Sequence, residues 1–308
     1  MHILLIFLDG IGLGDDDPAI NPFIAGATPT LDTLANGHRW IHATGRQASD
    51  RAIFLPTDAA LGVAGRPQSG TGQAAILTGL NVPQMMGRHY GPKPDAETRA
   101  LLEQDNLFKR VLARGLTAQL INAYPPGLLA SIARGKTLRS SIQHAVYGAG
   151  LPMQDVSRLY SGEALSEDWT GEGWRRHLNF TDTPVYSPYD AGRNMVEVSR
   201  NYDFAFFSHW MTDTLGHRGT LDEAVSLLET FDEVMRGALD VWQDDEGLMI
   251  ITSDHGNFEH IGDRHHTLNP VPTVVIGERR VEFADGFSAL TDIAPRIERL
   301  LFESREGI

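Results

Sequence analysis

The 308-residue sequence contains no cysteine. Disulfide bonds and thiolate metal sites are therefore excluded, and any bound metal must be held by oxygen atoms or imidazole nitrogens. Basic residues are also scarce, because 26 Lys and Arg stand against 40 Asp and Glu, which gives a net charge of −14. This balance disfavours nucleic acid as a partner, since phosphate backbones attract basic surfaces. Bound cations could still bring a small phosphorylated molecule to an acidic protein.

Long hydrophobic runs are missing as well. The first apolar run extends from Ile3 to Leu8 and is ended by Asp9. It is too short for the hydrophobic region of a signal peptide, and far shorter than the roughly 20 residues that span a membrane. We therefore expect a soluble, cytoplasmic protein without a membrane partner. Hydrophobic residues make up 42% of the chain, which is enough for a sizeable core.

Short apolar segments alternate with helical patterns along the chain. The segments typical of buried strands are residues 3–8, 117–123, 202–208, 247–253 and 272–277. Helical patterns cover residues 95–114, 220–242 and 289–301, and a further helix is expected after Thr28, its predicted N-cap. Such alternation predicts an α/β fold with a mainly parallel sheet that is covered by helices on both faces.

One region departs from this alternation. Residues 125–190 begin with two prolines, contain two tryptophans and several glycines, and have few apolar strand patterns. We expect residues 1–124 and 191–308 to form one core, and residues 125–190 to form a small cap or insertion over one edge of the sheet.

Side chains that can bind metals stand next to the predicted strands. In chain order they are Asp9, Asp213 with His217, Asp254 with His255, and His266. Because functional groups of open α/β sheets gather outside the carboxyl ends of the strands, we expect these residues to meet at one edge. Each of them alone has an ordinary explanation, as a turn residue, a helix cap or a surface histidine. The combination indicates a site for a divalent ion such as Zn, Mn or Mg.

The segment GRPQSGTGQAAILTG, residues 65–79, places Ser69 and Thr71 at the predicted start of a helix. Free N–H groups and the helix dipole favour negative charge there. A hydroxyl group bound to a divalent cation would be partly activated as a nucleophile. Serine and threonine are also the usual helix N-caps, so the local sequence leaves both explanations open.

Taken together, these segments resemble the alkaline phosphatase superfamily, and within it the metalloenzyme branch of cofactor-independent phosphoglycerate mutase and phosphopentomutase. The similar motifs are LDGIG (8–12), PQSGTGQ (67–73), DTLGH (213–217), SDHGN (253–257) and HTLNPVP (266–272). ATPTLDTLANG (27–37) and LTDIAPRIERLL (290–301) also look like structural signatures of the superfamily. The resemblance implies an alkaline-phosphatase-like three-layer sandwich.

The resemblance also implies two divalent ions, which could be Mn, Zn or Mg. It assigns one ion to Asp213, His217 and His266, and the other to Asp9, Asp254, His255 and Ser69. It selects Ser69 as the nucleophile, which would form a phosphoserine, and it selects His266 over His265 as a ligand. His260 and His265 are expected beside the ligands or at the surface.

Two departures from the branch's pattern affect the expected activity. Gln73 stands where the mutases carry histidine, and the large phosphate-transferring domain of the glycerate mutase is missing. We therefore predict a two-metal hydrolase of the phosphomonoesterase kind acting on a small phosphorylated substrate. The alternatives are a phosphomutase acting on a small sugar phosphate or phosphoglycerate, and a non-catalytic metal-binding relative. A sulfatase is disfavoured, because no Cys/Ser-x-Pro-x-Arg sequence surrounds Ser69.

Three residues shortly after the nucleophile segment are candidates for contacts with the substrate phosphate. They are Arg88, His89 and Lys93, and their other explanation is a solvated basic loop. The sequence leaves open the natural substrate, the metal and the oligomeric state.

Overall fold

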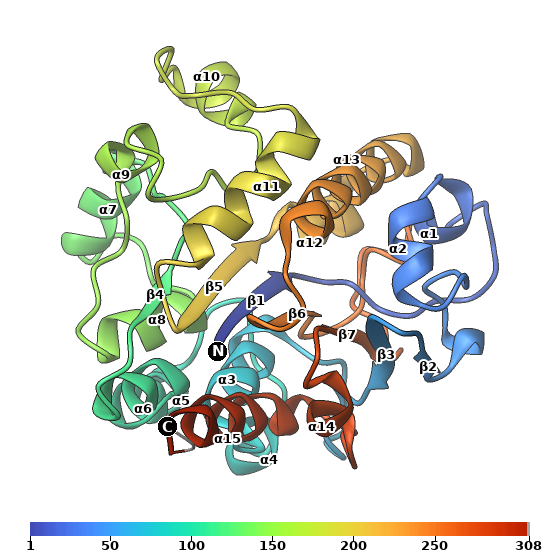
Figure 1. Ribbon diagram of the computed structural model, residues 1–308, viewed down its shortest axis with the longest axis horizontal. Helices are drawn as coiled ribbons and strands as arrows, with labels where there is room; N and C mark the ends of the chain where they lie inside the picture. Colours follow the sequence, from blue (N-terminus) through green and yellow to red (C-terminus); the bar gives the residue numbers. More distant parts are fainter. Residues whose placement is uncertain (307–308) are drawn as a thin grey trace.

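The computed structural model describes residues 1–306, and one seven-stranded sheet forms its centre (Figure 1). The strands are β1 (His2–Leu8), β2 (Gln47–Ala48), β3 (Ala52–Thr57), β4 (Ala118–Leu120), β5 (Phe204–His209), β6 (Gly247–Thr252) and β7 (Val271–Ile276), in the order β2-β3-β7-β6-β1-β5-β4. β1 pairs in parallel with β5 and β6, and β4 pairs in parallel with β5. β7 is antiparallel to β6 and β3, and β2 is antiparallel to β3. The sheet is thus mainly parallel, as the sequence predicts.

Helices cover both faces of this sheet. One face carries α3 (Ser69–Thr78), α4 (Val82–Met86), α5 (Ala96–Gln104), α6 (Leu107–Ala113), α8 (Ser141–Gly148), α14 (Arg280–Ala284) and α15 (Ile293–Glu306). The other carries α1 (Pro22–Ala25), α2 (Pro29–Leu34), α11 (Pro188–Ser199), α12 (Met211–Arg218) and α13 (Leu221–Val241). In β1, residues 3, 5 and 7 belong to one core cluster, and residues 4, 6 and 8 belong to the other. Because both faces of this strand are buried, its sequence is apolar throughout.

Two local predictions differ from the structure. The helix expected over residues 95–114 is divided into α5 and α6, because Asn106 caps α6 by accepting the Lys109 N–H at 3.1 Å. Strand β3 has no counterpart among the predicted strands. Its sequence contains Pro56, which disfavours a strand interior, but Pro56 lies opposite Pro272 of β7. Two residues without N–H groups therefore share one position of the ladder.

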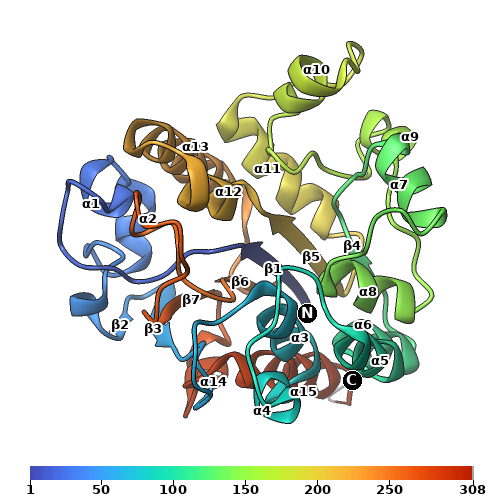
Figure 2. The same cartoon turned by 180° about the vertical axis from the view of Figure 1, so that it is seen from behind.

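The segment 125–190 contains α7 (Pro126–Ala133), α8, α9 (Val156–Tyr160) and α10 (Glu172–Leu178). Helix α8 packs against α3 and α5, and Figure 2 shows it beside α3. Its apolar residues belong to the main core. A separate small cluster joins Leu159, Ala164 and Trp174, and α10 projects furthest from the sheet (Figure 1). The division of the chain into core and cap stays a prediction. Among the described residues, no helix has the length and apolar character needed to cross a membrane.

Candidate metal centre

The predicted metal ligands lie together at one edge of the sheet. The residues are Asp9 directly after β1, Asp213 and His217 on α12 after β5, Asp254 and His255 after β6, and His266 in the loop before β7. Because β7 is antiparallel to β6, the start of β7 lies at the same edge as the ends of β1 and β6. The antiparallel direction of β7 therefore explains how His266, which precedes its strand, meets ligands that follow β1, β5 and β6.

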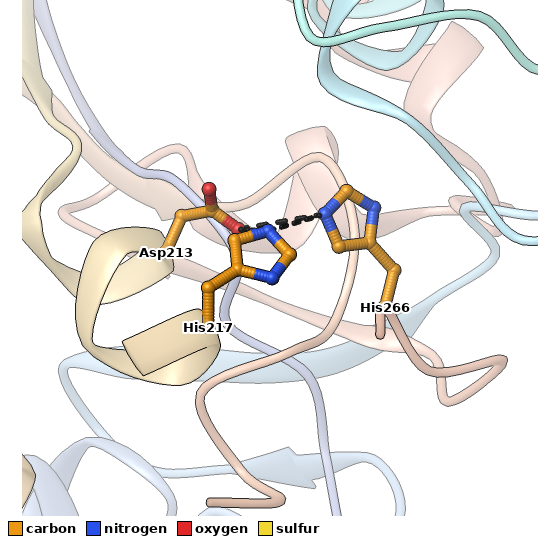
Figure 3. Close-up of side chains that lie close together, drawn as sticks. All are labelled: Asp213, His217 and His266. Atoms are coloured by element: carbon orange, nitrogen blue, oxygen red, sulfur yellow. Dashed lines mark hydrogen bonds and ion pairs between the residues drawn. The ribbon is translucent and has the colours of Figure 1, made fainter. Parts of the chain in front are cut away.

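The first group of ligands consists of Asp213, His217 and His266 (Figure 3). Asp213 Oδ1 lies 3.4 Å from His217 Nε2 and 3.6 Å from His266 Nε2. The two Nε2 atoms are 3.2 Å apart. His217 Nδ1 lies 2.7 Å from the carbonyl oxygen of Arg264, and His266 Nδ1 lies 2.7 Å from that of Pro67.

These backbone contacts define which nitrogen of each ring carries a proton. A carbonyl oxygen only accepts hydrogen bonds, so each Nδ1–H donates, and each neutral ring leaves a lone pair on Nε2. Two such lone pairs facing each other at 3.2 Å repel unless a cation or a proton lies between them. Backbone carbonyls that orient imidazoles in this way are typical partners of metal-binding histidines. The residues therefore fit a divalent ion.

The second group surrounds His255. His255 Nε2 lies 2.9 Å from Ser69 Oγ, 3.3 Å from Asp9 Oδ1 and 3.7 Å from Asp254 Oδ2. Asp9 Oδ1 and Asp254 Oδ2 are buried and accept no hydrogen bond from any described residue. Unsatisfied buried carboxylate oxygens that converge in this way fit a cation. Candidate ligand atoms of Asp9, Asp213 and His255 also lie within 4.8 Å of one another, so Asp213 lies between the two groups.

The electrostatics of the centre also favour a bound cation. Burial raises the pKa of Asp254, and the neighbouring Asp9 carboxylate raises it further. Burial alone would lower the pKa of His255, but the Asp254 and Asp9 carboxylates outweigh it and raise the pKa to about 10. Burial would raise the pKa of Asp213, but the hydrogen bond to His266 and the charge of His255 lower it to about 2. The cluster thus requires positive charge, which a proton or a divalent ion can supply.

Helix α3 brings Ser69 to this cluster. Ser69 is its first residue and is 5% exposed. A Cβ atom on Gly72 would lie 3.0 Å from the Asp254 carbonyl oxygen, and a Cβ atom on Gly70 would lie 2.5 Å from that of Tyr90. The glycines therefore allow the start of the helix to pack directly against the strand-end loops. The Thr71 hydroxyl accepts the Tyr90 N–H at 3.1 Å, so it is engaged in this packing.

Gln73, the residue that departs from the mutase pattern, also contacts the centre. Its side-chain amide donates to Asp9 Oδ2 at 3.1 Å. Asn257 donates to Asp213 Oδ1 at 2.9 Å, and the Thr212 hydroxyl donates to the Asp9 carbonyl oxygen at 2.5 Å. These bonds hold the orientation of two predicted ligands, as neighbours of metal ligands commonly do.

Glu259 is a contributor that the sequence analysis missed. Its side chain is buried, and its Oε2 atom accepts the N–H of Gly12 at 3.0 Å and that of Asn257 at 2.7 Å. Its Oε1 atom accepts the Thr267 hydroxyl and, at 3.0 Å, the side-chain amide of Asn269. One carboxylate therefore joins the loop after β1, which carries Asp9, to two parts of the loop between β6 and β7, which carries His255 and His266. The sequence signal is an acidic residue in the run NFEH, close to two of the predicted ligands.

A cavity of about 330 Å³ opens beside Asp9, Ser69 and Asp213. Lys93, one of the three candidate phosphate contacts, lines it. Arg88 and His89 instead line a separate surface hollow, where Arg88 pairs with Asp95 at 3.5 Å and His89 bonds the Val63 carbonyl oxygen at 3.3 Å. The structure therefore does not bring Arg88 and His89 to the predicted ligands.

His260 and His265, which are expected beside the ligands or at the surface, also have defined positions. His265 is solvent-exposed and pairs with Asp263 at 2.7 Å. His260 lies in the turn after Asn257, where its N–H donates to the Asn257 carbonyl oxygen at 3.1 Å. The rings of His255 and His266 stack with centroids 3.7 Å apart, which brings the two groups of ligands into contact.

Known proteins resemble this chain in sequence and in fold. A family model described as the Metalloenzyme superfamily matches residues 1–303. The 2,3-bisphosphoglycerate-independent phosphoglycerate mutase of Acetivibrio thermocellus is 31% identical over 127 residues, which are 38% of this chain and 24% of that protein. That of Vibrio atlanticus is 38% identical over 90 residues, which are 27% of this chain and 18% of that protein. The match thus spans about a quarter of the curated relatives or less.

Two solved structures share the fold. The alkaline phosphatase from the Antarctic bacterium TAB5 superposes with a TM-score of 0.55 at 13% identity, over 97% of each chain. The phosphoglycerate mutase of Leishmania mexicana superposes with a TM-score of 0.52 at 11% identity, over 97% of this chain and 95% of that one. This likeness confirms the predicted alkaline-phosphatase-like fold.

Proposed function

Because this chain belongs to the Metalloenzyme superfamily, as its sequence motifs lead one to expect, we propose that it is a two-metal phosphomonoesterase with Ser69 as its nucleophile. The observation that carries the proposal is the position of Ser69. Its Oγ atom lies 2.9 Å from His255 Nε2, next to the candidate ligand groups and at the wall of the cavity. A hydroxyl so placed can reach a phosphoryl group that the same centre binds.

We propose the following roles for the residues. Asp213, His217 and His266 hold one divalent ion, and Asp9, Asp254, His255 and Ser69 hold the other. The ions, when bound, polarise the phosphoryl group and stabilise the attacking and leaving oxygens. Mn, Zn and Mg all suit this oxygen and nitrogen donor set.

In the reaction, Ser69 Oγ attacks phosphorus while the bond from phosphorus to the substrate's ester oxygen breaks, and the alcohol leaves with a proton. Water then cleaves the phosphoserine, which releases phosphate and restores the Ser69 hydroxyl. Ser69 begins α3, where the helix dipole favours the negative charge of the transferring group. Lys93, at the wall of the cavity, offsets part of the remaining phosphate charge.

The cavity favours hydrolysis over the mutase alternative. A mutase must hold a substrate while its phosphoryl group moves between two hydroxyls, and phosphoglycerate also carries a carboxylate. Lys93 is the single basic residue among those that line the cavity. The curated mutases are also much longer than the segment that this chain matches. Transfer of the phosphoryl group to water needs no second site that holds the rest of the substrate.

The cytoplasmic location of the protein stays a prediction.

The test is release of phosphate from p-nitrophenyl phosphate with added Mn, Zn or Mg. We expect metal-dependent turnover that falls by a factor on the order of a thousand or more in Ser69→Ala, as when other enzymes lose their nucleophile. Thr71→Ser, which retains a hydroxyl two residues away, is the matched control and keeps most of the activity. Full activity in Ser69→Ala, or no turnover with any of the three metals, would refute the proposal. Isomerisation of 3-phosphoglycerate without phosphate release would support the mutase.

A further inference from the structure

The cavity is lined by two chemically different sets of residues. Asp9, Ser69 and Asp213 form the set at the metal centre. Lys93, the single cationic residue of the lining, interacts electrostatically with Asp9 and so belongs to the same set. Once the phosphoryl group is bound there, the lining has no cation left for a second acidic group on the substrate.

A second set of lining residues is largely apolar. It consists of Tyr124, Leu128, Leu138, Ile142 and Trp210. The rings of Tyr124 and Trp210 are within 8° of parallel, with centroids 6.4 Å apart. Apart from the charged residues at the metal centre, the polar side chains of the lining are neutral, and Ser140 and Gln143 already bond each other in the capping box of α8. A charged group placed here would lose water without gaining an ionic partner.

Two of these apolar side chains are exposed to solvent. Trp210 is 38% exposed and Leu138 is 54% exposed, whereas each of the other four tryptophans is at most 4% exposed. Leaving large apolar surface in water at the mouth of a cavity is unfavourable, and an apolar ligand that covers it is favoured for the same reason. The exposed surface thus has the chemistry of a binding wall.

We propose that this cavity selects small phosphomonoesters whose alcohol is uncharged and carries one aromatic ring or a comparable apolar group, which packs on Trp210 beside Leu138. The inference rests on the proposed function, because the phosphoryl group defines the position of the alcohol. The volume of about 330 Å³ is at the lower end of the range for small-molecule sites, roughly 300 to 1,000 Å³. It suits a phosphoryl group with one ring, and it disfavours nucleotides and larger conjugates.

Binding can be tested without turnover by using phosphonates on the Mn-loaded protein. Phenylphosphonate carries a ring, and 3-phosphonopropionate carries a carboxylate in its place. We expect calorimetry to show phenylphosphonate binding at least about tenfold more tightly, a difference of about 1.4 kcal/mol. Because Trp210 is the exposed tryptophan, acrylamide quenching of fluorescence reports mainly on its ring. We expect phenylphosphonate, and not 3-phosphonopropionate, to reduce this quenching.

Two variants sharpen the test. Leu138→Lys supplies the missing cation and is expected to move the preference toward 3-phosphonopropionate by about tenfold or more. Leu178→Ala, at an exposed leucine on α10 outside the lining, is the control and leaves the preference unchanged. The proposal is overturned if 3-phosphonopropionate binds the wild-type protein equally well, if neither phosphonate binds, or if phenylphosphonate leaves the quenching unchanged.

The outcomes also separate this inference from the proposed function. Selective binding of phenylphosphonate without hydrolysis of any monoester would support the inferred selectivity and reject the phosphatase. Efficient hydrolysis of 3-phosphoglycerate, with poor hydrolysis of phenyl phosphate, would support the phosphatase and reject the selectivity.

Discussion

Metal binding is expected to release a proton from His255. In the metal-free protein the Asp254 and Asp9 carboxylates overcome the effect of burial and raise the pKa of His255 to about 10, so its ring is protonated at neutral pH. A divalent ion binds only the neutral imidazole. The ion and the proton therefore compete. At pH values below the pKa of His255, the apparent metal affinity rises about tenfold for each unit by which the pH increases. Between about pH 7 and about pH 9, the expected gain is on the order of a hundredfold.

Calorimetric titration of the metal-free protein with Mn measures this competition. Repeating the titration in two buffers with different ionisation enthalpies gives the number of protons released, which we expect to be at least one at about pH 7.5. His265→Asn alters an exposed histidine beside a predicted ligand and retains the release, whereas His255→Asn loses it. If the wild-type protein releases no proton, or if its affinity is independent of pH, the proposed electrostatics of the centre are wrong.

The same shift has a consequence for stability. The pKa of His255 is raised in the folded protein from an ordinary value of 6.5 to about 10. Its contribution to the free energy of unfolding is therefore fully present below pH 6.5 and is lost as the pH rises through about 10. The Tm of the metal-free protein is expected to fall across this window. Mn-loaded protein is expected to lose less, because the ion replaces the proton, and an equal loss in both forms would contradict this explanation.

Four further substitutions test other parts of the structure. Glu259→Gln places an amide N–H₂ group among N–H donors, and we expect Mn affinity measured by calorimetry to fall about 10- to 100-fold; unchanged affinity would exclude a positioning role for Glu259. Asp213→Asn is expected to weaken both Mn sites, since Asp213 belongs to both ligand groups, and His217→Asn only one; loss of a single site in both variants would argue against a shared ligand. Phe206→Ala, in the buried centre of β5, is expected to reduce the free energy of unfolding in urea by about 3–5 kcal/mol. A change well below this range would mean that neighbouring side chains fill the space left by the removed ring.

The sequence predicts best where one physical cause dominates. Strands buried on both faces, such as β1, are apolar throughout and can be recognised from composition alone. Their carboxyl ends locate Asp9, Asp213 and Asp254 at one edge without further information. The break between α5 and α6 escapes prediction because it depends on the capping bond of Asn106, which competes with helix continuation across the same residues.

Features that depend on several distant segments are harder to predict. The joining role of Glu259 requires the loop after β1 to meet two parts of the loop between β6 and β7, so an acidic residue close to the predicted ligands does not reveal this role by itself. Strand β3 contains a proline that lies opposite Pro272 of a strand distant in sequence, and this pairing cannot be read from the local sequence. Arg88 and Lys93 are close in sequence and both basic, yet only Lys93 lines the cavity. The path of the loop after α4 decides this difference, and charge alone does not encode it.

Residues 125–190 contact the helix that carries two of the predicted metal ligands. The Glu167 carboxylate accepts the N–H groups of Trp210 and Met211, at 2.8 and 3.1 Å, at the start of α12. The first N–H groups of a helix have no partners within it, and the helix dipole favours a negative charge there. Glu167 therefore caps the helix that carries Asp213 and His217, and the same bonds hold the backbone of Trp210 at the cavity wall. A change at Trp210 consequently risks disturbing the metal ligands. Leu138 lines the same cavity and takes no part in this contact, so selectivity can change there while metal binding is retained.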